Sequence, residues 1–233
     1  MGYADLHIHS TYSHDGVFSI PSILQYTSEF TDLSVIAITD HDEIDGALEA
    51  MRLAPVYGLD VVPGCEITSR DGHILALYIQ ERVPAGLSAL ETVLRVGELG
   101  GLCVAAHPMA RGVHGISAAN LLALLDHPQA KEILVGVEAY NAGLILQGSN
   151  YRVQRLVKDL PVAQTGGSDS HVLFTISQGV TYFPGKTADD LRLALLRRQT
   201  RAIKRETSPI LKVVRQWLPL TIKRRMGWAG HAS

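Results

Sequence analysis

Eight short apolar segments in this chain have the composition of buried β-strands. They cover residues 3–9, 35–39, 61–64, 74–79, 102–106, 134–140, 162–165 and 180–183. Most are continuously apolar rather than alternating, which is typical of strands that are covered on both faces. Helical patterns lie between them, and two begin with capping boxes, formed by Ser88 with Glu91 and by Thr187 with Asp190. This alternation of strands and helices predicts parallel strands and a single α/β domain.

Acidic and histidine residues gather where these segments end. The seven clusters are residues 5–9, 13–16, 39–42, 64–66, 72–73, 106–108 and 167–171. In a (β/α) barrel, the ends of the strands are where the catalytic groups collect. Clusters spread along the whole chain therefore predict a multinuclear metal site and an enzyme.

The spacing within the clusters favours shared metal binding. His7 and His9 lie two residues apart on an expected strand, so their side chains point to the same side and can bind one ion together. Asp169 and His171 repeat this spacing, and Glu66, at the expected end of its strand, can bridge two cations. A mixture of imidazoles and carboxylates suits zinc, manganese or iron better than magnesium or calcium. Two or more such ions can generate a hydroxide and hold the oxygens of a phosphate.

Other polar residues and histidines are not expected to bind metal directly. Asp40 and Asp42 flank His41 and are expected to orient metal ligands. Glu138 and Asn141 either line the pocket or cap a strand end. Three further histidines match no cluster and are expected at the surface: His114, His127 and His231.

Composition limits the class of protein. The chain has 233 residues and 46% hydrophobic content, enough for one core of barrel size. Its two cysteines form no disulfide framework, which favours a reducing compartment. The first strand begins near residue 3 and leaves no room for a signal peptide, and no segment is long and apolar enough to span a bilayer. We therefore expect a cytoplasmic protein without a transmembrane segment.

Basic residues are concentrated near the C-terminus. Residues 1–190 carry 22 acidic and 10 basic side chains, whereas residues 191–233 carry one acidic and 11 basic side chains. Apolar residues at positions 210, 213, 214, 217 and 218 fall on one helical face until Pro219, and three basic residues follow at 223–225. Such a segment could bind a membrane surface, contact nucleic acid, or pack on the barrel or a second subunit. We therefore divide the chain into a barrel over residues 1–205 and a basic amphipathic tail over residues 206–233.

The ordered motifs resemble those of one enzyme superfamily. DLHIHSTYSHDG, ITDHDEIDG, PGCEITS, GHILALY, AAHP and GGSDSH lie between Asp5 and about Phe183. They are similar to the motifs of the PHP (polymerase and histidinol phosphatase) superfamily, especially its small stand-alone phosphoesterases. The resemblance implies a distorted (β/α)7 TIM-like barrel that holds three divalent ions of zinc, manganese or iron. The implied ligands are His7, His9, Glu66 and Asp169 for the first ion, Glu66, His73 and His107 for the second, and Asp15, His41 and His171 for the third.

The same resemblance implies hydrolysis of phosphate esters by a metal-bound hydroxide. Glu66, Asp169 and His171 would lie at the reacting centre. The expected substrates are nucleotides or 5′-phosphorylated oligonucleotides, cleaved by a phosphatase or a 5′–3′ exonuclease, and the alternative is a small metabolite such as histidinol phosphate. Arg111, four residues after His107, is the candidate for phosphate binding because a guanidinium can make bidentate contacts.

Two other classes of protein compete with this interpretation. A metal-dependent amidohydrolase also begins with two histidines on a barrel strand, but it often bridges its metals with a carboxylated lysine, and here Glu66 can supply the bridge. A non-catalytic metal-binding module could recruit a partner through the basic tail, although a complete ligand set disfavours this class.

Overall fold

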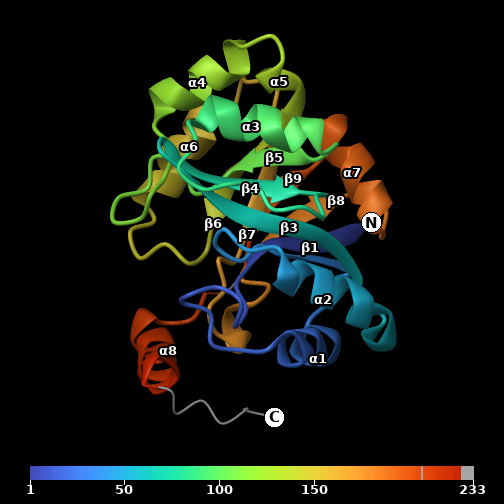
Figure 1. Ribbon diagram of the computed structural model, residues 1–233, viewed down its shortest axis with the longest axis vertical. Coiled ribbons are helices and arrows are strands. Elements are labelled where there is room, and N and C mark those ends of the chain that lie inside the picture. The colour runs from blue at the N-terminus through green and yellow to red at the C-terminus, as the bar shows by residue number, and fades with distance from the viewer. Residues whose placement is uncertain (206, 227–233) are drawn as a thin grey trace.

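The computed structural model describes residues 1–205 and 207–226, which form a curved sheet with helices around it (Figure 1). The strands are β1 (Gly2–Ile8), β2 (Val35–Ile38), β3 (Asp60–Ser69), β4 (Gly72–Leu77), β5 (Leu102–Ala105), β6 (Leu134–Asn141), β7 (Ala163–Gly167), β8 (Gly179–Phe183) and β9 (Arg201–Lys204). The helices are α1 (Ile20–Phe30), α2 (Asp45–Leu53), α3 (Ala89–Glu98), α4 (Ala118–Asp126), α5 (Ala130–Ile133), α6 (Gly148–Val157), α7 (Ala188–Leu196) and α8 (Ile210–Arg225), with 3-10 turns at Ala54–Tyr57 and Leu173–Thr175.

The sheet curls until it is nearly closed. Its strand order is β7-β6-β5-β4-β3-β2-β1-β8-β9, and the chain that follows β7 returns to the end of β1. There the Ser170 amide donates to the His7 carbonyl at 3.2 Å, and the His9 amide donates to the Ser170 carbonyl at 3.0 Å. The predicted single α/β domain with a distorted TIM-like barrel is thereby confirmed.

Strand direction departs from the prediction of parallel strands. β1, β2 and β3 run parallel, as do β5, β6 and β7, but β4 is antiparallel to both β3 and β5. β8 is also antiparallel to its neighbours β1 and β9. Only Arg70 and Asp71 separate β3 from β4. So short a connection forms a hairpin, because a parallel crossover takes about a dozen residues or more.

Two strands differ from the segments expected from sequence. β3 continues to Ser69, so Glu66 lies inside this strand and the prediction that it ends the strand is wrong. The sequence did not predict β9, because this short strand at the edge of the sheet has no apolar pattern and carries exposed basic side chains at Arg201 and Lys204. An edge strand can remain polar because only one side of its backbone pairs with a neighbour.

The predicted capping boxes begin two of the helices. At the start of α3 the Glu91 amide donates to the Ser88 hydroxyl at 3.2 Å, and the Ser88 amide donates to the Glu91 carboxylate at 2.8 Å. Thr187 and Asp190 form the equivalent box at the start of α7. In Figure 1, α3, α4 and α5 lie together on one side of the sheet, and α1 and α2 lie together on another.

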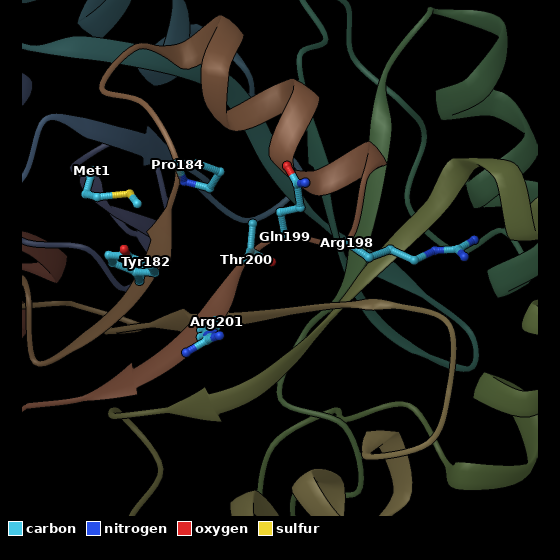
Figure 2. Close-up of a pocket in the computed structure, with 7 residues that line it drawn as sticks. All are labelled: Met1, Tyr182, Pro184, Arg198, Gln199, Thr200 and Arg201. Carbon is cyan, nitrogen blue, oxygen red and sulfur yellow. The ribbon is translucent and has the colours of Figure 1, made fainter.

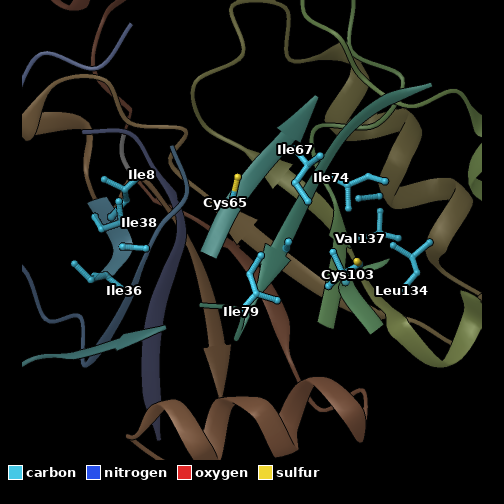
Figure 3. Packing of buried hydrophobic residues seen from close by; sticks show 14 of the residues in the cluster. Ile8, Ile36, Ile38, Cys65, Ile67, Ile74, Ile79, Cys103, Leu134 and Val137 are labelled. Carbon is cyan, nitrogen blue, oxygen red and sulfur yellow. The ribbon is translucent and has the colours of Figure 1, made fainter. Parts of the chain in front are cut away.

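The two faces of the sheet bury separate apolar clusters. The outer cluster lies between the sheet and helices α1 to α6 and includes Ile38 of β2 and Cys65 of β3 (Figure 3). The inner cluster lies on the opposite face, where α7 closes it. Leu6 belongs to the inner cluster but Ile8 belongs to the outer one, because the register of β1 against β2 shifts between Asp5 and Ile8. Such an irregularity changes the direction in which the following side chains point.

Helix α8 extends past the residue at which the sequence predicts its end. Pro219 lies inside the helix. It lacks the amide that would donate to the carbonyl of Arg215, but both residues are exposed, so water can take the place of this bond. The predicted apolar face is divided, because Trp217 is partly buried and Leu218 is exposed.

None of the described helices is long and apolar enough to cross a bilayer. Residue 206 and residues 227–233 of the predicted tail, including His231, lie outside the described residues.

The inner cluster generates a stability prediction. Phe183 is fully buried there, whereas Phe30 of α1 is 68% exposed. We expect Phe183→Ala to lower the free energy of unfolding by about 3–5 kcal/mol, because it removes packed aromatic surface and leaves a cavity. Phe30→Ala should change it by less than about 0.5 kcal/mol. Urea unfolding followed by circular dichroism measures both, and a small loss for Phe183→Ala would contradict its packing.

Candidate metal centre

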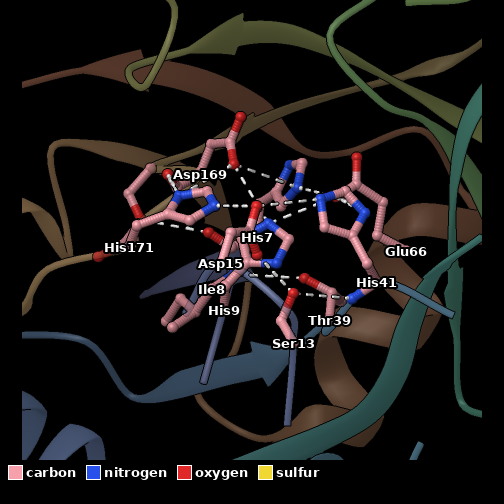
Figure 4. A network of polar contacts seen from close by, with 12 residues as sticks. His7, Ile8, His9, Ser13, Asp15, Thr39, His41, Glu66, Asp169 and His171 are labelled. Carbon is pink, nitrogen blue, oxygen red and sulfur yellow. Dashed lines mark hydrogen bonds and ion pairs between the residues drawn. The ribbon is translucent and has the colours of Figure 1, made fainter. Parts of the chain in front are cut away.

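The nine side chains expected to bind metal meet at one end of the barrel. Figure 4 shows most of them, among them His7, Glu66 and Asp169. His7 and His9 come from the end of β1, Asp15 from the loop that follows, His41 from the segment after β2, Glu66 from β3, His73 from β4, His107 from the segment after β5, and Asp169 and His171 from the loop after β7. They form five overlapping groups, in each of which three ligand atoms lie within 4.8 Å of one another. The described residues therefore contain a cluster of histidines and carboxylates that is able to bind metal ions.

Glu66 lies at the middle of this cluster. Its Oε2 atom is 3.1 Å from His7 Nε2, 3.3 Å from His9 Nε2 and 3.3 Å from His41 Nδ1. Its Oε1 atom is 2.9 Å from both His73 Nδ1 and His107 Nε2. One buried carboxylate therefore faces five imidazoles, divided between its two oxygens, as a bridging ligand would.

The hairpin of β3 and β4 explains how Glu66 and His73 meet. Thr68 pairs with His73, and Glu66 pairs with Leu75. Residues two apart on a strand share a face, so His73 lies diagonally across from Glu66 on the same side of the sheet. Cys65 and Ile67 point to the outer cluster, as alternation requires. Cys65 therefore points away from the metal ligands.

Two aspartates complete the cluster on either side of Glu66. Asp169 Oδ1 lies 3.2 Å from His9 Nε2 and 3.6 Å from His7 Nε2. Asp15 Oδ2 lies 3.0 Å from His171 Nε2 and 3.5 Å from His41 Nε2. The structure places the Asp15 side chain, which is 19% exposed, inside the site, whereas the neighbouring His14 side chain is 70% exposed.

The hydrogen-bonding pattern of the cluster fits a metal site. Among the described residues, the buried ring nitrogens His7 Nε2, His9 Nε2 and His73 Nδ1 have no hydrogen-bond partner. Carboxylate oxygens nevertheless lie about 3 Å from them, at distances of 3.1 Å for His7 and 2.9 Å for His73. The distances between these atoms are those of hydrogen bonds, but the angles are not. Ligands arranged around a shared cation have this geometry. Nitrogen and oxygen donors in this mixture suit zinc, manganese or iron.

The ionised carboxylates of the site also favour the presence of positive charge. Burial opposes ionisation of Glu66 and Asp169, but His7 and the other facing imidazoles hold the pKa of both carboxyls well below their usual range. Burial likewise opposes a charge on His171, yet the hydrogen bond with Asp15 and the charge of Asp169 raise its pKa to about 9. Carboxylates of this kind stabilise nearby cations, whether these are protons on the rings or metal ions.

Glu138 and Asn141 form a layer of polar contacts beneath the ligands. Glu138 is 1% exposed, and its Oε1 atom lies 3.0 Å from His7 Nδ1. Its Oε2 atom accepts from the His107 amide at 2.7 Å and from Asn141 Nδ2 at 2.9 Å, and Asn141 also donates to Asp169 at 3.2 Å. Any side chain at Gly167 would collide with Glu138 and His7, which accounts for the glycine there. The sequence left the role of Glu138 open, and the contacts now indicate that it orients His7.

Asp40 and Asp42 hold the backbone around the site, as expected for residues that support ligands. Asp40 Oδ1 accepts from the Ser10 amide at 2.6 Å and from the Ser13 amide at 3.1 Å, which fixes the start of the Asp15 loop. Asp42 Oδ1 accepts from the Thr68 amide at 2.7 Å. Both aspartates therefore act through the backbone and not by touching the imidazoles.

The segment between β5 and α4 brings a further histidine to the cluster. His114 is exposed, as predicted, but its ring stacks on His73 with centroids 5.4 Å apart and planes inclined by 12°. The His73 amide also donates to the His114 carbonyl at 2.8 Å. Sequence patterns gave no signal for this contact, because His114 follows no apolar segment. Arg111 lies exposed in the same segment.

A separate pocket lies at the other end of the barrel. Figure 2 shows Tyr182, Arg198 and Arg201 among its lining residues. Tyr182 pairs with Tyr3 near the start of β1, whereas His7 lies at the end of that strand. This pocket is therefore not part of the metal cluster.

Comparisons with known proteins agree with the geometry. A family model described as "PHP domain" matches residues 5–217. An uncharacterized protein of Methanocaldococcus jannaschii is 33% identical over 171 residues, which cover 68% of this chain and 93% of that protein. A crystal structure of a two-domain protein from Bacteroides vulgatus, containing a predicted PHP-like metal-dependent phosphoesterase, superimposes with a TM-score of 0.69 at 18% identity and covers 87% of this chain and 64% of that chain.

Two relatives with named activities match only part of the chain. A 5′-3′ exoribonuclease of Haemophilus influenzae is 36% identical over 92 residues, covering 38% of this chain and 33% of that protein. A phosphoribosyl 1,2-cyclic phosphate 1,2-diphosphodiesterase of Eggerthella lenta is also 36% identical over 92 residues, covering 37% of this chain and 34% of the other. The chain therefore spans about a third of the length of each.

The contacts of Glu138 generate a prediction about metal affinity. Both of its oxygens face donors, so Glu138→Gln must turn an NH₂ group toward one of them. We expect this variant to bind Mn²⁺ roughly 10-fold to 100-fold more weakly, because residues that orient a ligand typically contribute that much. Equilibrium dialysis with metal analysis measures the change. Glu132→Gln, at an exposed position of α5, is the matched control, and equal affinity in both variants would contradict the role of Glu138.

Proposed function

Because the chain belongs to the PHP domain family and gathers five imidazoles around one buried carboxylate, we propose that it hydrolyses phosphate esters of nucleotides or 5′-phosphorylated oligonucleotides. A phosphatase and a 5′–3′ exonuclease are the two forms that this activity can take. The observation that carries the proposal is the position of Glu66, whose two oxygens face separate sets of imidazoles.

Three sets of residues would hold the ions. His7, His9, Glu66 and Asp169 would hold one, Glu66, His73 and His107 a second, and Asp15, His41 and His171 a third. When bound, zinc, manganese or iron ions supply an activated water and offset the negative charge on phosphoryl oxygens.

The protein contributes orientation and charge balance. Glu138 Oε1, 3.0 Å from His7 Nδ1, leaves the Nε2 atom of the same ring directed at Glu66 and Asp169. Asn141 holds the second oxygen of Asp169 at 3.2 Å, so Oδ1 faces His9. These contacts keep the ligand atoms in place before substrate arrives, which lowers the cost of reorganisation during the reaction.

The segment that carries Arg111 and His114 is the candidate for phosphate recognition. It lies beside His73 through the stacked His114 ring, and both side chains are exposed. A guanidinium can donate two parallel hydrogen bonds to a phosphate group. We therefore assign Arg111 the contact with the substrate phosphate.

One partial relative supports the preference for oligonucleotide substrates, and the other acts on a small sugar phosphate. The Haemophilus influenzae relative is a 5′-3′ exoribonuclease, and the Eggerthella lenta relative acts on a phosphoribosyl cyclic phosphate. The second relative also fits the alternative of a small-metabolite phosphatase of the histidinol phosphatase type. A non-catalytic module remains the rival outside the enzymes, and contact of the basic tail with nucleic acid or membrane stays a prediction.

The activity is tested with Mn²⁺-loaded protein and a short 5′-phosphorylated RNA. We expect mononucleotides to appear, and Asp169→Asn to lower the rate by more than roughly 100-fold, since loss of a residue that only orients a ligand already costs about 10-fold to 100-fold. Asp159→Asn, at an exposed position, is the matched control and should retain the wild-type rate. Chromatography separates mononucleotides from inorganic phosphate.

Each other product pattern identifies a rival. Phosphate release without shortening of the RNA would indicate a phosphomonoesterase and redirect the search to small metabolites. Cleavage of amides but not of phosphate esters would indicate an amidohydrolase. Metal binding without hydrolysis of any of these substrates would support the non-catalytic module.

The role of Arg111 is tested by steady-state kinetics. We expect Arg111→Ala to raise KM for the phosphate ester by roughly 10-fold, because one charge-assisted hydrogen bond is worth about 1.5–3 kcal/mol and an exposed one lies at the low end. The value of kcat should change much less. Arg197→Ala, just after α7, is the control, and unchanged KM in both variants would show that Arg111 is an ordinary surface residue.

A further inference from the structure

Helix α8 lies against the loop that carries Asp15. The Trp217 indole nitrogen donates to the Asp15 carbonyl at 2.9 Å. The Arg224 guanidinium donates to the Ser13 carbonyl at 2.6 Å and to the Thr11 carbonyl at 2.5 Å, and it also donates to Gly16. Two side chains of one helix therefore hold four carbonyl groups within six residues of the loop.

The same helix is tied to the chain that follows His171. Just before α8, the Ser208 amide donates to Gln178 Oε1 at 2.9 Å, and Gln178 Nε2 donates to the Ser208 hydroxyl at 2.8 Å. At the first turn of α8, Lys212 Nζ lies 4.3 Å from the centre of the Phe174 ring. The helix thus spans two segments that approach each other where Asp15 Oδ2 meets His171 Nε2 at 3.0 Å.

The contacts that hold α8 against the barrel are mainly polar, and burial of apolar side chains contributes little to its attachment. Thr221 is the only buried side chain of α8, whereas Leu211 is 80% exposed and Leu218 is 46% exposed. A helix held only by the hydrophobic effect would turn such residues inward. Instead its inner face carries the donors of Trp217 and Arg224, which match the carbonyls of the loop. A guanidinium offers five donors in a fixed planar arrangement, so it can fix several carbonyls at once.

The loop needs such support because Asp15 is remote from the strands. Its Ser10 end is fixed by Asp40, and Ser13 Oγ donates to Asp15 Oδ1 at 2.6 Å. The side chains of α8 donate to four carbonyls of the same loop. The carboxylate of Asp15 is thereby fixed from both sides of its backbone.

We propose that α8 is a functional part of the metal centre, in which Trp217 and Arg224 act as positioning residues that hold Asp15 for the ion shared with His41 and His171. This inference rests on the proposed function, which assigns that ion to these three ligands. It gives the basic C-terminal segment a task inside the protein, where the sequence left only external partners or plain packing.

The test measures metal bound per chain by equilibrium dialysis against Mn²⁺. The variants are Trp217→Phe, which keeps the ring and removes the donor, Arg224→Met, and Arg224→Lys, which keeps the charge but not the planar set of donors. Arg225→Met, at the exposed neighbouring position, is the matched control, and Asp15→Asn is the reference for loss of the ion. Circular dichroism verifies that each variant is folded.

We expect Trp217→Phe and Arg224→Met to bind the Asp15-dependent ion roughly 10-fold to 100-fold more weakly, as loss of orienting residues does. Arg224→Lys should recover part of the affinity, and Arg225→Met should match the wild type. Adding Arg224→Met to Asp15→Asn should cause no further loss of the ion, because both changes act on the same ligand.

Wild-type metal affinity in both Trp217→Phe and Arg224→Met would overturn the proposal. Helix α8 would then only pack on the barrel, without a role in metal binding. Undiminished metal content in Asp15→Asn would overturn the assignment of Asp15 as a ligand and the positioning role with it. The proposed function fails separately: if the variants lose the ion as expected but the wild type cleaves no phosphate ester, the positioning role stands and the assigned reaction does not.

Discussion

The structure depends on one buried carboxylate that is surrounded by imidazoles. Glu66 is 1% exposed, and an ionised carboxylate at such a position is stable only with cations or donors around it. Five histidines from four strands and their following segments supply that environment. The same arrangement makes the cluster a place where positive charge must gather. The need to balance Glu66 and the ability to bind metal ions are therefore two aspects of the same electrostatics.

Local irregularities of the fold direct the ligands toward this point. The register of β1 shifts between Asp5 and Ile8, just where His7 turns to the cluster. His107 and Asp169 have backbone φ angles of 26° and 51°, and residues other than glycine seldom adopt positive φ angles. Strained backbone of this kind persists where surrounding contacts enforce it, and here Glu138 and Asn141 provide them. The ligand geometry is thus set by contacts between distant segments and not by the local preferences of each one.

The polar support consists of two buried layers and one partly exposed layer. Glu138 lies beneath the ligands, Asp40 holds the loop after β1, and the side chains of α8 hold the same loop from outside. The α8 contact is the most exposed of these layers, so an ion held by Asp15, as proposed above, would be the one most open to change. This order would give the proposed ions unequal affinities.

The sequence by itself determined eight of the nine strands, because each of the eight is a short apolar segment whose pattern is local. The motifs in and beside these segments supplied the candidate ligands through their resemblance to a known superfamily. The sequence also determined the capping boxes at Ser88 and Thr187. Only the tertiary structure decided the antiparallel course of β4, the place of Glu66 inside β3, and the contacts of His114 and Arg224. These features join residues far apart in the chain or depend on how a turn closes. Local propensity cannot specify them, since they arise only when the sheet curls and brings its ends together.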